Sequence, residues 1–407
     1  MEVKESSARY LAKPAYKQTD VGMIPEDWEV KPIGDIHPFV TSGSRGWAAF
    51  YSEFGSPFIR ITNLSRECIY PDLSDLRFVS IPCSNSEGSR TQLKDGDVLI
   101  SITADIGIVG YVTTQMPKPA YINQHIALVR FDTTQTCPLY VSYFLAAERT
   151  QKLFRSLTDS GAKAGMNLAT VKQIKVTFPP SAAEQQAIAE ALSDADALIE
   201  ALEQLLVKKG QIKQGAMQEL LTGQKRLPGF AEEWGVKSLG ELVEIRKGEL
   251  ITEKSAIHGL IPVVAGGKKP AYFHNVANRW GKTITISGSG ASAGYVAFFD
   301  MPIFASDCST ISESANYAIE FIYFVLLLNQ NAIYKAQTGG AQPHIHPNDL
   351  RPMTVSVPKA KAEQTAIATV LSDMDAEIAA VVAKLAKARQ IKQGMMQELL
   401  TGRIRLV

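Results

Sequence analysis

Two segments far apart in the chain share one helical pattern of apolar and polar positions. In residues 184–223, apolar side chains recur at alternating steps of four and three, at Ile188, Leu192, Ala195, Ile199, Leu202 and Leu206. The matching positions of residues 363–402 hold Ile367, Leu371, Met374, Ile378, Val381 and Leu385. This pattern is typical of the seam of a helix that pairs with another helix. Because the seam is short, it favours a helix pair within one chain over a filament.

The two segments are also copies of one another. Residues 184–223 and 363–402 align without a gap and are identical at 26 of 40 positions, including QIKQGAMQELLTG at Gln211 and QIKQGMMQELLTG at Gln390. A second similarity relates IPEDWEVKPIGDI at Ile24 to FAEEWGVKSLGEL at Phe230. Each half of the chain therefore reads as an opening motif, a variable region and a repeated helix. This order indicates a duplication that diverged in its middle.

Charge along the repeated helices indicates how they pair. In both copies acidic residues come first and basic residues follow, for example Glu184 and Asp196 before Lys209 and Lys213. This gradient partly suits the dipole of each helix by itself. Parallel pairing would set acid against acid, whereas antiparallel pairing sets each acidic half beside a basic half. We therefore expect an antiparallel pair with a pseudo-twofold axis, the variable regions toward opposite ends, and the chain termini close together.

The variable regions read as mixed α/β. Apolar runs typical of strands occur in residues 96–112, 121–131 and 282–299, and helices are expected over 139–157 and 319–337. The predicted fold is two α/β recognition domains separated by an antiparallel two-helix coiled-coil spacer. The expected segments are a first domain at 1–180 with its opening motif at 21–36, a first helix at 181–226, a second domain at 227–358 and a second helix at 359–407.

Composition supports a large, water-soluble protein. The chain has 407 residues, of which 45% are hydrophobic and 20% charged, enough for two or three domain cores. Its longest apolar run, FIYFVLLL at Phe321, is far shorter than a membrane span, and no signal peptide is evident near Met1. The four cysteines are Cys68, Cys83, Cys137 and Cys308. They have no CxxC spacing, and they are too few for a framework of disulfide bonds. We expect a reduced, cytoplasmic protein without membrane contact.

Positive charge is concentrated locally although the net charge is only +1. Residues 149–175 hold six bases against one acid, and residues 246–282 hold seven bases against two acids. Each variable region thus contains a stretch of about +5, which is typical of a nucleic-acid-binding surface. Ordinary solvated faces could carry the same charges.

The order of opening motif, variable region and repeated helix, twice over, with QIKQG and QELLTG closing both helices, resembles the specificity subunit of a type I restriction-modification system. The resemblance covers nearly the whole chain, although a TAEL-like repeat found in some members is missing. It implies a non-catalytic subunit whose two target recognition domains each read one half of a bipartite site on double-stranded DNA. It also implies that the helices space these domains and bind two adenine-N6 methyltransferase (modification) subunits, which restriction subunits with motor and nuclease activity join.

Motifs that would indicate catalysis or a cofactor are incomplete. WGKT at Trp280 lacks the first glycine of a phosphate-binding loop. GSGASAG at Gly288 follows a predicted strand and leads into another strand, whereas a dinucleotide-binding loop opens a helix. His344 and His346 have no Cys or acidic partner at metal-ligand spacing. We therefore expect no cofactor, no metal and no catalytic residue in this chain.

Loop residues with side chains that can reach base edges or phosphates are the candidate DNA contacts. In the first domain they are Ser44, Arg45, Asn63, Gln124 and His125 for bases, with Lys163 and Asn167 toward phosphate. In the second domain they are Lys247, Lys268, Lys269, Arg279, Gln342 and His344. The repeated polar residues of the helices are candidates for partner binding, at Gln211, Lys213, Gln214, Gln390, Lys392 and Gln393. A loop Asn or Gln also commonly caps a turn.

A different class of function remains open. A stand-alone DNA-binding regulator or scaffold could carry the same domains without enzyme partners. Such a protein should bind DNA alone, whereas a specificity subunit should copurify with two methyltransferase chains, one for each repeat.

Overall fold

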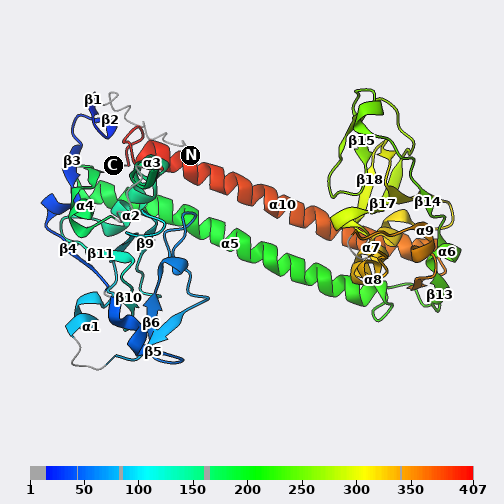
Figure 1. Ribbon diagram of the computed structural model, residues 1–407, viewed down its shortest axis with the longest axis horizontal. Helices are drawn as coiled ribbons and strands as arrows, with labels where there is room; N and C mark the ends of the chain where they lie inside the picture. Colours follow the sequence, from blue (N-terminus) through cyan, green and yellow to red (C-terminus); the bar gives the residue numbers. More distant parts are fainter. Residues whose placement is uncertain (1–14, 44, 82–85, 160–165, 340–341, 407) are drawn as a thin grey trace, which may run out of the picture. The chain divides into compact units, whose positions relative to one another are not determined.

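The computed structural model describes residues 15–43, 45–81, 86–159, 166–339 and 342–406. The chain divides into two compact units (Figure 1). Unit 1 comprises residues 1–201 together with 385–407, and unit 2 comprises residues 202–384. Each unit therefore contains part of both long helices, although these helices lie far apart in the sequence.

Unit 1 is built around a four-stranded antiparallel sheet in the order β4-β11-β8-β9. These strands are β4 (Phe39–Ser42), β8 (Val98–Ser101), β9 (Val109–Tyr111) and β11 (Ile126–Arg130). Every residue of β8 is buried, as expected for a short apolar run at the centre of a sheet. A second sheet has the order β10-β6-β7-β5, and its pair β6–β10 is parallel. Its strands are β5 (Tyr51–Ser52), β6 (Ser56–Ile59), β7 (Arg77–Val79) and β10 (Tyr121–Ile122).

The remaining elements of unit 1 join these sheets to the long helices. Two small antiparallel pairs are β1 (Tyr16–Thr19) with β2 (Gly22–Pro25), and β3 (Glu29–Pro32) with β12 (Lys175–Phe178). The short helices are η1 (Ile33–Ile36), η2 (Arg45–Phe50), η3 (Ile61–Asn63), α1 (Ser86–Thr91), α2 (Pro138–Ala146), α3 (Glu148–Asp159) and α4 (Leu168–Gln173). Helix α2 is buried along nearly its whole length, so it forms the centre of the unit.

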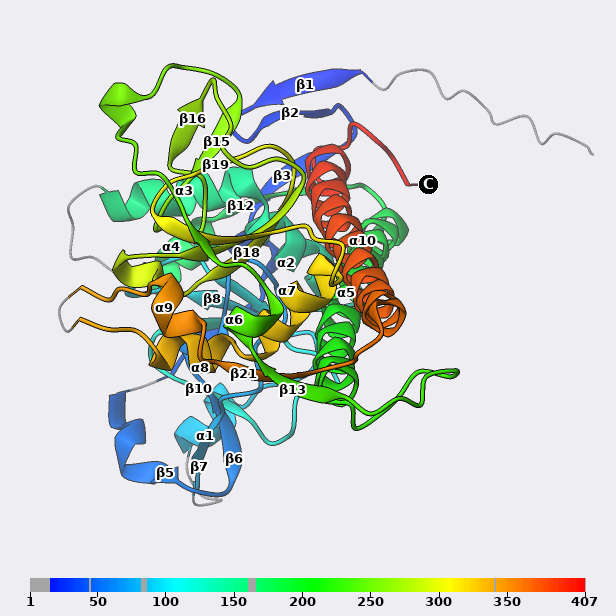
Figure 2. The ribbon, with the colours of Figure 1, turned by 90° about the vertical axis from the view of Figure 1, so that its right-hand side faces the viewer.

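Unit 2 repeats this plan with shorter connections. Its four-stranded sheet has the order β14-β20-β17-β18. Its smaller sheet has the order β16-β15-β19, with β15 and β19 parallel, and these three strands lie together in Figure 2. The strands are β13 (Gly235–Ser238), β14 (Arg246–Lys247), β15 (Ile261–Val264), β16 (Tyr272–His274), β17 (Lys282–Ser287), β18 (Val296–Asp300), β19 (Phe304–Ala305), β20 (Cys308–Ser312) and β21 (Thr354–Val357). The short helices are α6 (Leu239–Leu242), η4 (Glu253–Ser255), η5 (Gly290–Ser292), α7 (Ile319–Leu328), α8 (Gln330–Lys335) and α9 (Pro347–Leu350). The pair β13–β21 matches β3–β12 of unit 1, and α7 matches α2. The predicted mixed α/β class and the internal repeat are confirmed.

The helices predicted over 139–157 and 319–337 are each interrupted. Ala147 is extended between α2 and α3, and Asn329 separates α7 from α8. Side chains satisfy carbonyl groups at both breaks: Gln151 donates to Leu145 O at 2.8 Å, and the Asn329 amide donates to Val325 O at 2.8 Å. A helical pattern of apolar residues does not reveal such breaks, because the apolar face continues across them.

The two long helices are α5 (Ala182–Leu221) and α10 (Lys361–Leu399), and they run antiparallel within each unit. In unit 2, Lys209 pairs with Glu377 at 2.6 Å and Lys213 pairs with Asp375. In unit 1, Lys392 pairs with Asp196, at the positions that match Lys213 and Asp375 in the other repeat. The acidic half of each helix thus contacts the basic half of the other. The prediction of antiparallel pairing from the charge gradient is confirmed.

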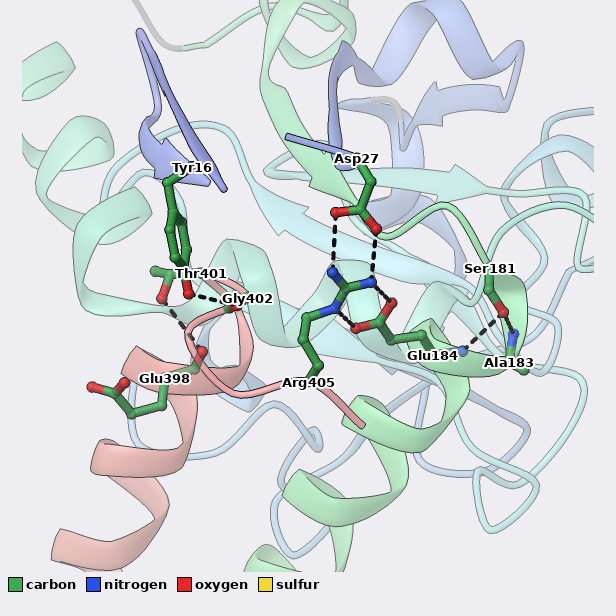
Figure 3. A network of polar contacts seen from close by, with 9 residues as sticks. All are labelled: Tyr16, Asp27, Ser181, Ala183, Glu184, Glu398, Thr401, Gly402 and Arg405. Carbon is green, nitrogen blue, oxygen red and sulfur yellow. Dashed lines mark hydrogen bonds and ion pairs between the residues drawn. The ribbon is translucent and has the colours of Figure 1, made fainter. Parts of the chain in front are cut away.

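An arginine clasp joins the end of each repeat to the beginning of the other repeat's helix. In unit 1, the Arg405 guanidinium makes paired contacts with Glu184 and with Asp27, the latter at 3.0 Å (Figure 3). Close by, the Tyr16 hydroxyl donates to Gly402 O at 3.4 Å. The described parts of the chain nearest its two ends therefore meet, as the cyclic order of the motifs predicts. In unit 2, Arg226 holds Glu363 in the same way, at 2.6 and 2.8 Å.

The core of each unit includes the final residues of the other repeat's helix. Leu399 and Leu400 are buried in the core of unit 1, with Trp28 of the first opening motif. Leu220 and Leu221 are buried in the core of unit 2, and Trp234 of the second opening motif packs against this core. Each unit is consequently completed by a segment that lies outside its own variable region.

Candidate nucleic-acid interface

Several loops of unit 2 converge at one end of its four-stranded sheet, and we call this surface the second rim. It comprises residues 247–249, 265–269, 287–294, 306–308 and the described part of 338–346. Gly290 N donates to Pro343 O at 3.0 Å, Ile345 N donates to Gly288 O at 3.0 Å, and the Ser287 hydroxyl donates to Gly267 O at 3.4 Å. The β17–β18 turn therefore lies at the centre of the rim. As predicted, GSGASAG connects two strands and does not open a long helix.

Unit 1 has a matching surface, the first rim, formed by residues 42–45, 101–107, 123–125 and 166–167, of which Ser44 lies outside the described residues. Ile102 N donates to His125 O at 2.9 Å, and Met166 N donates to Ile102 O at 2.8 Å. In the second rim the same two hydrogen bonds run from Gly288 to Asp307 and from Ile345 to Gly288. The hydrogen bonds thus place Ile102 opposite Gly288 and His125 opposite Asp307, and the two rims have one backbone plan.

A glycine lets the backbone approach closely in each rim. A Cβ added to Gly43 would lie 2.4 Å from the carbonyl carbon of Asn123, and one added to Gly248 would lie 2.1 Å from Ser306 O. Any larger residue at these positions would push the end of the first sheet strand away from the neighbouring segment. These glycines therefore hold the loops of each rim together.

Side chains in the first rim form a small polar network. The Thr103 hydroxyl hydrogen-bonds His125 Nδ1, and the Gln124 amide lies 3.0 Å from His125 Nε2. Thr103, Gln124 and His125 are all half-buried, so each presents part of its polar edge to solvent. Sequence reasoning selected Gln124 and His125 but missed Thr103, which lies far from them in the chain.

The other predicted DNA contacts of unit 1 differ in exposure and in their hydrogen bonds. Arg45 is exposed at the start of η2. Asn167 is also exposed, but its side-chain Oδ1 caps α4 by accepting a hydrogen bond from Thr170 N at 2.8 Å. Lys163, like Ser44, lies outside the described residues. The prediction for Asn63 is corrected. Its side chain is 3% exposed and bonds Arg60 N, Asp72 O and Asp75 O, so it holds a turn and cannot reach a base.

In unit 2, the exposed bases surround the second rim. Lys247, Lys268 and Lys269 are exposed, and Lys268 Nζ lies 5.5 Å from the centre of the Tyr295 ring. Arg279 is half-buried, and its guanidinium contacts other residues of the unit. It donates to Thr310 Oγ1 at 3.0 Å, to Asn278 O at 2.7 Å and to Lys247 O at 3.1 Å.

Two further candidates lie on the loop before α9. Gln342 is exposed, and His344 is half-buried with its ring stacked on His346 at a centroid distance of 6.1 Å. The backbone of His344 bridges to Ser289 and Thr338, which fixes this loop against the β17–β18 turn. The structure therefore gathers the Lys268, Ser289 and His344 segments at one surface, although they are widely separated in the sequence.

The second rim also contains an acidic group that sequence reasoning missed. Asp307 follows β19, is half-buried and accepts a hydrogen bond from the Ser289 hydroxyl. The next residue, Cys308, is a neutral thiol, because burial raises its pKa to about 12. The pairing of a loop hydroxyl with the side chain after the parallel strand thus occurs in both rims, as Thr103 with His125 and as Ser289 with Asp307.

The predicted partner-binding residues divide into two groups. Gln211, Gln214, Gln390 and Gln393 are exposed on the long helices. Lys213 and Lys392 are largely buried by ion pairs within the chain, with side chains 16% and 12% exposed, so their assignment as free partner contacts is corrected. Lys213 is largely buried because it lies on the seam of the helix pair. Continuing from Leu206, a step of three followed by a step of four reaches Lys213, which therefore lies between the helices.

An apolar residue on the exposed face was missed in both repeats. Ile212 is 52% exposed and its copy Ile391 is 51% exposed, each between the glutamines of QIKQG. Gly215 and Gly394 follow on the same segments, and a Cβ added to either would meet no atom within 4 Å among the described residues. We call these two segments, 211–215 and 390–394, the repeat faces.

Two kinds of feature are lacking in the described ranges. No helix there combines the length and the apolar character needed to cross a lipid bilayer. The same ranges contain no group of three or more His, Cys, Asp or Glu side chains placed to hold a metal ion.

Comparison with known proteins gives a consistent family. The model of the type I restriction modification DNA specificity domain matches residues 25–208 and again residues 231–388. A putative type I restriction enzyme MjaX specificity subunit from Methanocaldococcus jannaschii is 26% identical over 244 residues, 57% of this chain and 56% of the relative. A putative type I specificity subunit, S.MpnORF638P, from Mycoplasma pneumoniae is 31% identical over 149 residues, 36% of this chain and 40% of the relative. The chain thus spans about half the length of the curated relatives it matches.

A solved structure shares the fold. The crystal structure of a type I restriction-modification system S subunit from M. genitalium aligns with a TM-score of 0.64 at 15% identity, over 91% of this chain and 96% of that chain. The family model matches once in each half, over the two domains that carry the rims. The protein therefore belongs to the family of type I restriction-modification DNA specificity domains.

Proposed function

We propose that this chain is the DNA sequence-specificity subunit of a type I restriction-modification complex. Each domain reads one half of a bipartite site on double-stranded DNA, the first domain lying within residues 1–180 and the second within 227–358. The observation that carries this proposal is the pair of rims, which share one backbone plan but present different side chains. Two such surfaces in one chain suit a site with two unlike halves.

The chemistry of the rims suits DNA. Exposed Lys247, Lys268 and Lys269 can neutralise phosphates beside the second rim, and Arg45 can do so beside the first. Half-exposed Gln124 and His125 offer donors and acceptors for base edges. The phosphate contacts position each domain, and the central side chains of its rim select the bases.

The repeat faces suit two equivalent partners. A glycine inside a helix costs roughly 0.5–1 kcal/mol relative to alanine, and the packing of this chain does not require Gly215 or Gly394. Such a glycine lets another backbone approach closely, beside the exposed Ile212 or Ile391. We assign one adenine-N6 methyltransferase subunit to each repeat face and place the restriction subunits beyond them. Methyl transfer and DNA cleavage then belong to these partners, and this chain is non-catalytic.

The cysteines and the proposed DNA substrate together indicate the cellular compartment. The free thiols Cys68, Cys137 and Cys308 suit a reducing environment, and the proposed substrate is chromosomal DNA. We therefore assign the complex to the cytoplasm.

The test is methylation mapping with a stoichiometry measurement. The full chain is expressed with its modification subunit in a host that lacks both, and N6-methyladenine is mapped across the genome, with the modification subunit alone as the control. We expect a single bipartite motif and two modification subunits for each chain. A chain that binds DNA alone and directs no methylation would instead be a regulator or scaffold.

A further inference from the structure

The side chain at the centre of each rim differs in its hydrogen-bonding character. His125 occupies this position in the first rim, and Asp307 occupies it in the second, each held by the hydroxyl of the facing turn. A histidine ring can both donate and accept, whereas a carboxylate only accepts. The two domains therefore place different recognition groups at one structural position.

The surroundings of Asp307 leave one of its oxygens available. Ser289 occupies Oδ2, and within the described part of the chain no donor engages Oδ1. A Cβ at residue 288 would lie 2.8 Å from Oδ1, so Gly288 provides the space that this oxygen occupies. Because Asp307 is half-buried and fastened by Ser289, its free oxygen has a defined position at the surface.

The charge of Asp307 is unusual for a surface that binds phosphates. Lys247, Lys268 and Lys269 around it attract the DNA backbone, whereas a carboxylate repels it. A carboxylate fits such a surface only where DNA presents a hydrogen-bond donor. In the major groove the donors are the N4 amino group of cytosine and the N6 amino group of adenine. Adenine also presents the N7 acceptor beside its amino group, which disfavours a carboxylate.

We propose that Asp307 reads a cytosine in the half-site of the second domain, accepting a hydrogen bond from N4 through Oδ1 while Ser289 fixes the side chain. This inference rests on the proposed function, because it names a base contact of the same interface. His125, fastened by Thr103, reads the corresponding position of the first half-site with a different preference. The two half-sites thus differ at the position that these two equivalent side chains read.

The experiment selects binding sites from a library of DNA duplexes in which both half-sites are randomised. The full chain assembled with its modification subunits is used, and bound DNA is sequenced. The wild-type chain should enrich a cytosine at one position of the second half-site. Asp307→Asn should change that base to adenine, since an amide can pair with both N6 and N7 of adenine. The preference for cytosine should fall about tenfold or more, and the first half-site should stay the same.

Two further variants separate recognition from folding. Asp300→Asn removes a carboxylate at the other end of the β17–β18 hairpin and should leave both half-sites unchanged. Ser289→Ala keeps the carboxylate but releases it, so the cytosine preference should weaken at that single position. If Asp307→Asn loses the second half-site altogether, Ser289→Ala decides: an unweakened cytosine preference overturns the inference.

The outcomes also separate this inference from the proposed function. An unchanged bipartite site in Asp307→Asn, or a wild-type second half-site without a cytosine, overturns the reading role of Asp307 alone. A wild-type complex that enriches no bipartite site overturns the proposed function and this inference with it.

Discussion

In the first rim, Ile102 donates its backbone N–H to the residue that carries the central side chain, and in the second rim Gly288 does so. Ile102 is 6% exposed and packs into the core, while His125 turns toward Thr103. Gly288 has no side chain, and the Asp307 carboxylate fills the space beside it. The backbone plan is thus retained while a neighbouring scaffold residue changes together with the central side chain. A side chain at residue 288 would crowd the Asp307 carboxylate, since an added Cβ would lie 2.8 Å from Oδ1.

The clasps show a similar relation at the ends of the helices. Glu184 and Glu363 are both buried, with side chains 1% exposed, and each is paired with an arginine from the other repeat. The guanidinium of each arginine lies 5.7 Å from a tryptophan ring, Trp28 or Trp234. Arg405 holds an additional acid, Asp27, whereas in unit 2 the Trp234 indole N–H donates to Glu363 at 3.3 Å. The same joint is therefore stabilised by different auxiliary contacts.

The largest effect should come from removing the second repeat. A fragment ending at Arg226 loses Leu399, Leu400 and Arg405 from unit 1 but retains their copies Leu220, Leu221 and Arg226. Two fragments can exchange these segments, so we expect a dimer by light scattering. The dimer should dissociate on dilution, because covalent linkage no longer raises the effective concentration. A fragment ending at Gly210 lacks the segments and should stay monomeric. Monomers from both fragments would show that the repeats cannot replace one another.

Arg405→Ala should be the most destabilising single substitution of the clasps. It leaves Glu184 buried without its charged partner, which costs about 3–5 kcal/mol of unfolding free energy. Arg226→Ala should cost about 1 kcal/mol less, because Trp234 still donates to Glu363. The control is Arg403→Ala, whose pair with Glu398 is exposed and should contribute about 0.5 kcal/mol or less. Chemical denaturation measures the loss of unfolding free energy in all three variants, and hydrogen exchange shows which of the two units is destabilised. Equal losses for Arg403→Ala and Arg405→Ala would contradict the role of burial.

The matched lysines between the helices should differ in their contribution. Lys392→Ala leaves Asp196 buried, with the Tyr143 hydroxyl at 2.7 Å as its remaining partner, and should cost about 2–3 kcal/mol. Lys213→Ala leaves Asp375 with a side chain 44% exposed, where water can solvate it, and should cost about 1 kcal/mol or less. Adding Asp196→Asn to Lys392→Ala should recover part of the loss in a denaturation experiment. A larger loss for Lys213→Ala would reverse the proposed order.

The smallest change should follow from lengthening both helices. Four helix-favouring residues after Leu206 and four after Leu385 fall at the division between the units, so the ion pairs within each unit keep their register. Four residues add about 6 Å and about 400° of helix, one turn plus about 40°. One base pair of DNA adds about 3.4 Å and about 34°. Methylation mapping should show unchanged half-sites and a gap longer by one or two base pairs. An unchanged gap would mean that the helices do not set the spacing.

The sequence determined the features that depend on local or repeated patterns. The apolar steps of four and three predicted the long helices, and the charge gradient predicted their antiparallel pairing. The cyclic order of the motifs predicted that the two ends of the chain lie close together, and Tyr16 indeed contacts Gly402. These predictions succeeded because helical periodicity and charge along a helix are properties of a continuous segment. The same seam could have placed Lys213 between the helices, had its steps been followed past Leu206.

Tertiary structure alone decided which loop side chains meet. Thr103 reaches His125, and Ser289 reaches Asp307, because the β8–β11 and β17–β20 registers bring the ends of these strands together. Asn63 is buried by hydrogen bonds within its own turn, and the Arg279 guanidinium donates to Thr310, which lies 31 residues further along the chain. A loop Asn, Arg or Asp looks equally polar in a sequence whether its hydrogen bonds are satisfied inside the fold or left open at the surface. Burial and partner geometry separate these cases, and both are set by how the chain folds around each side chain and not by the residue type.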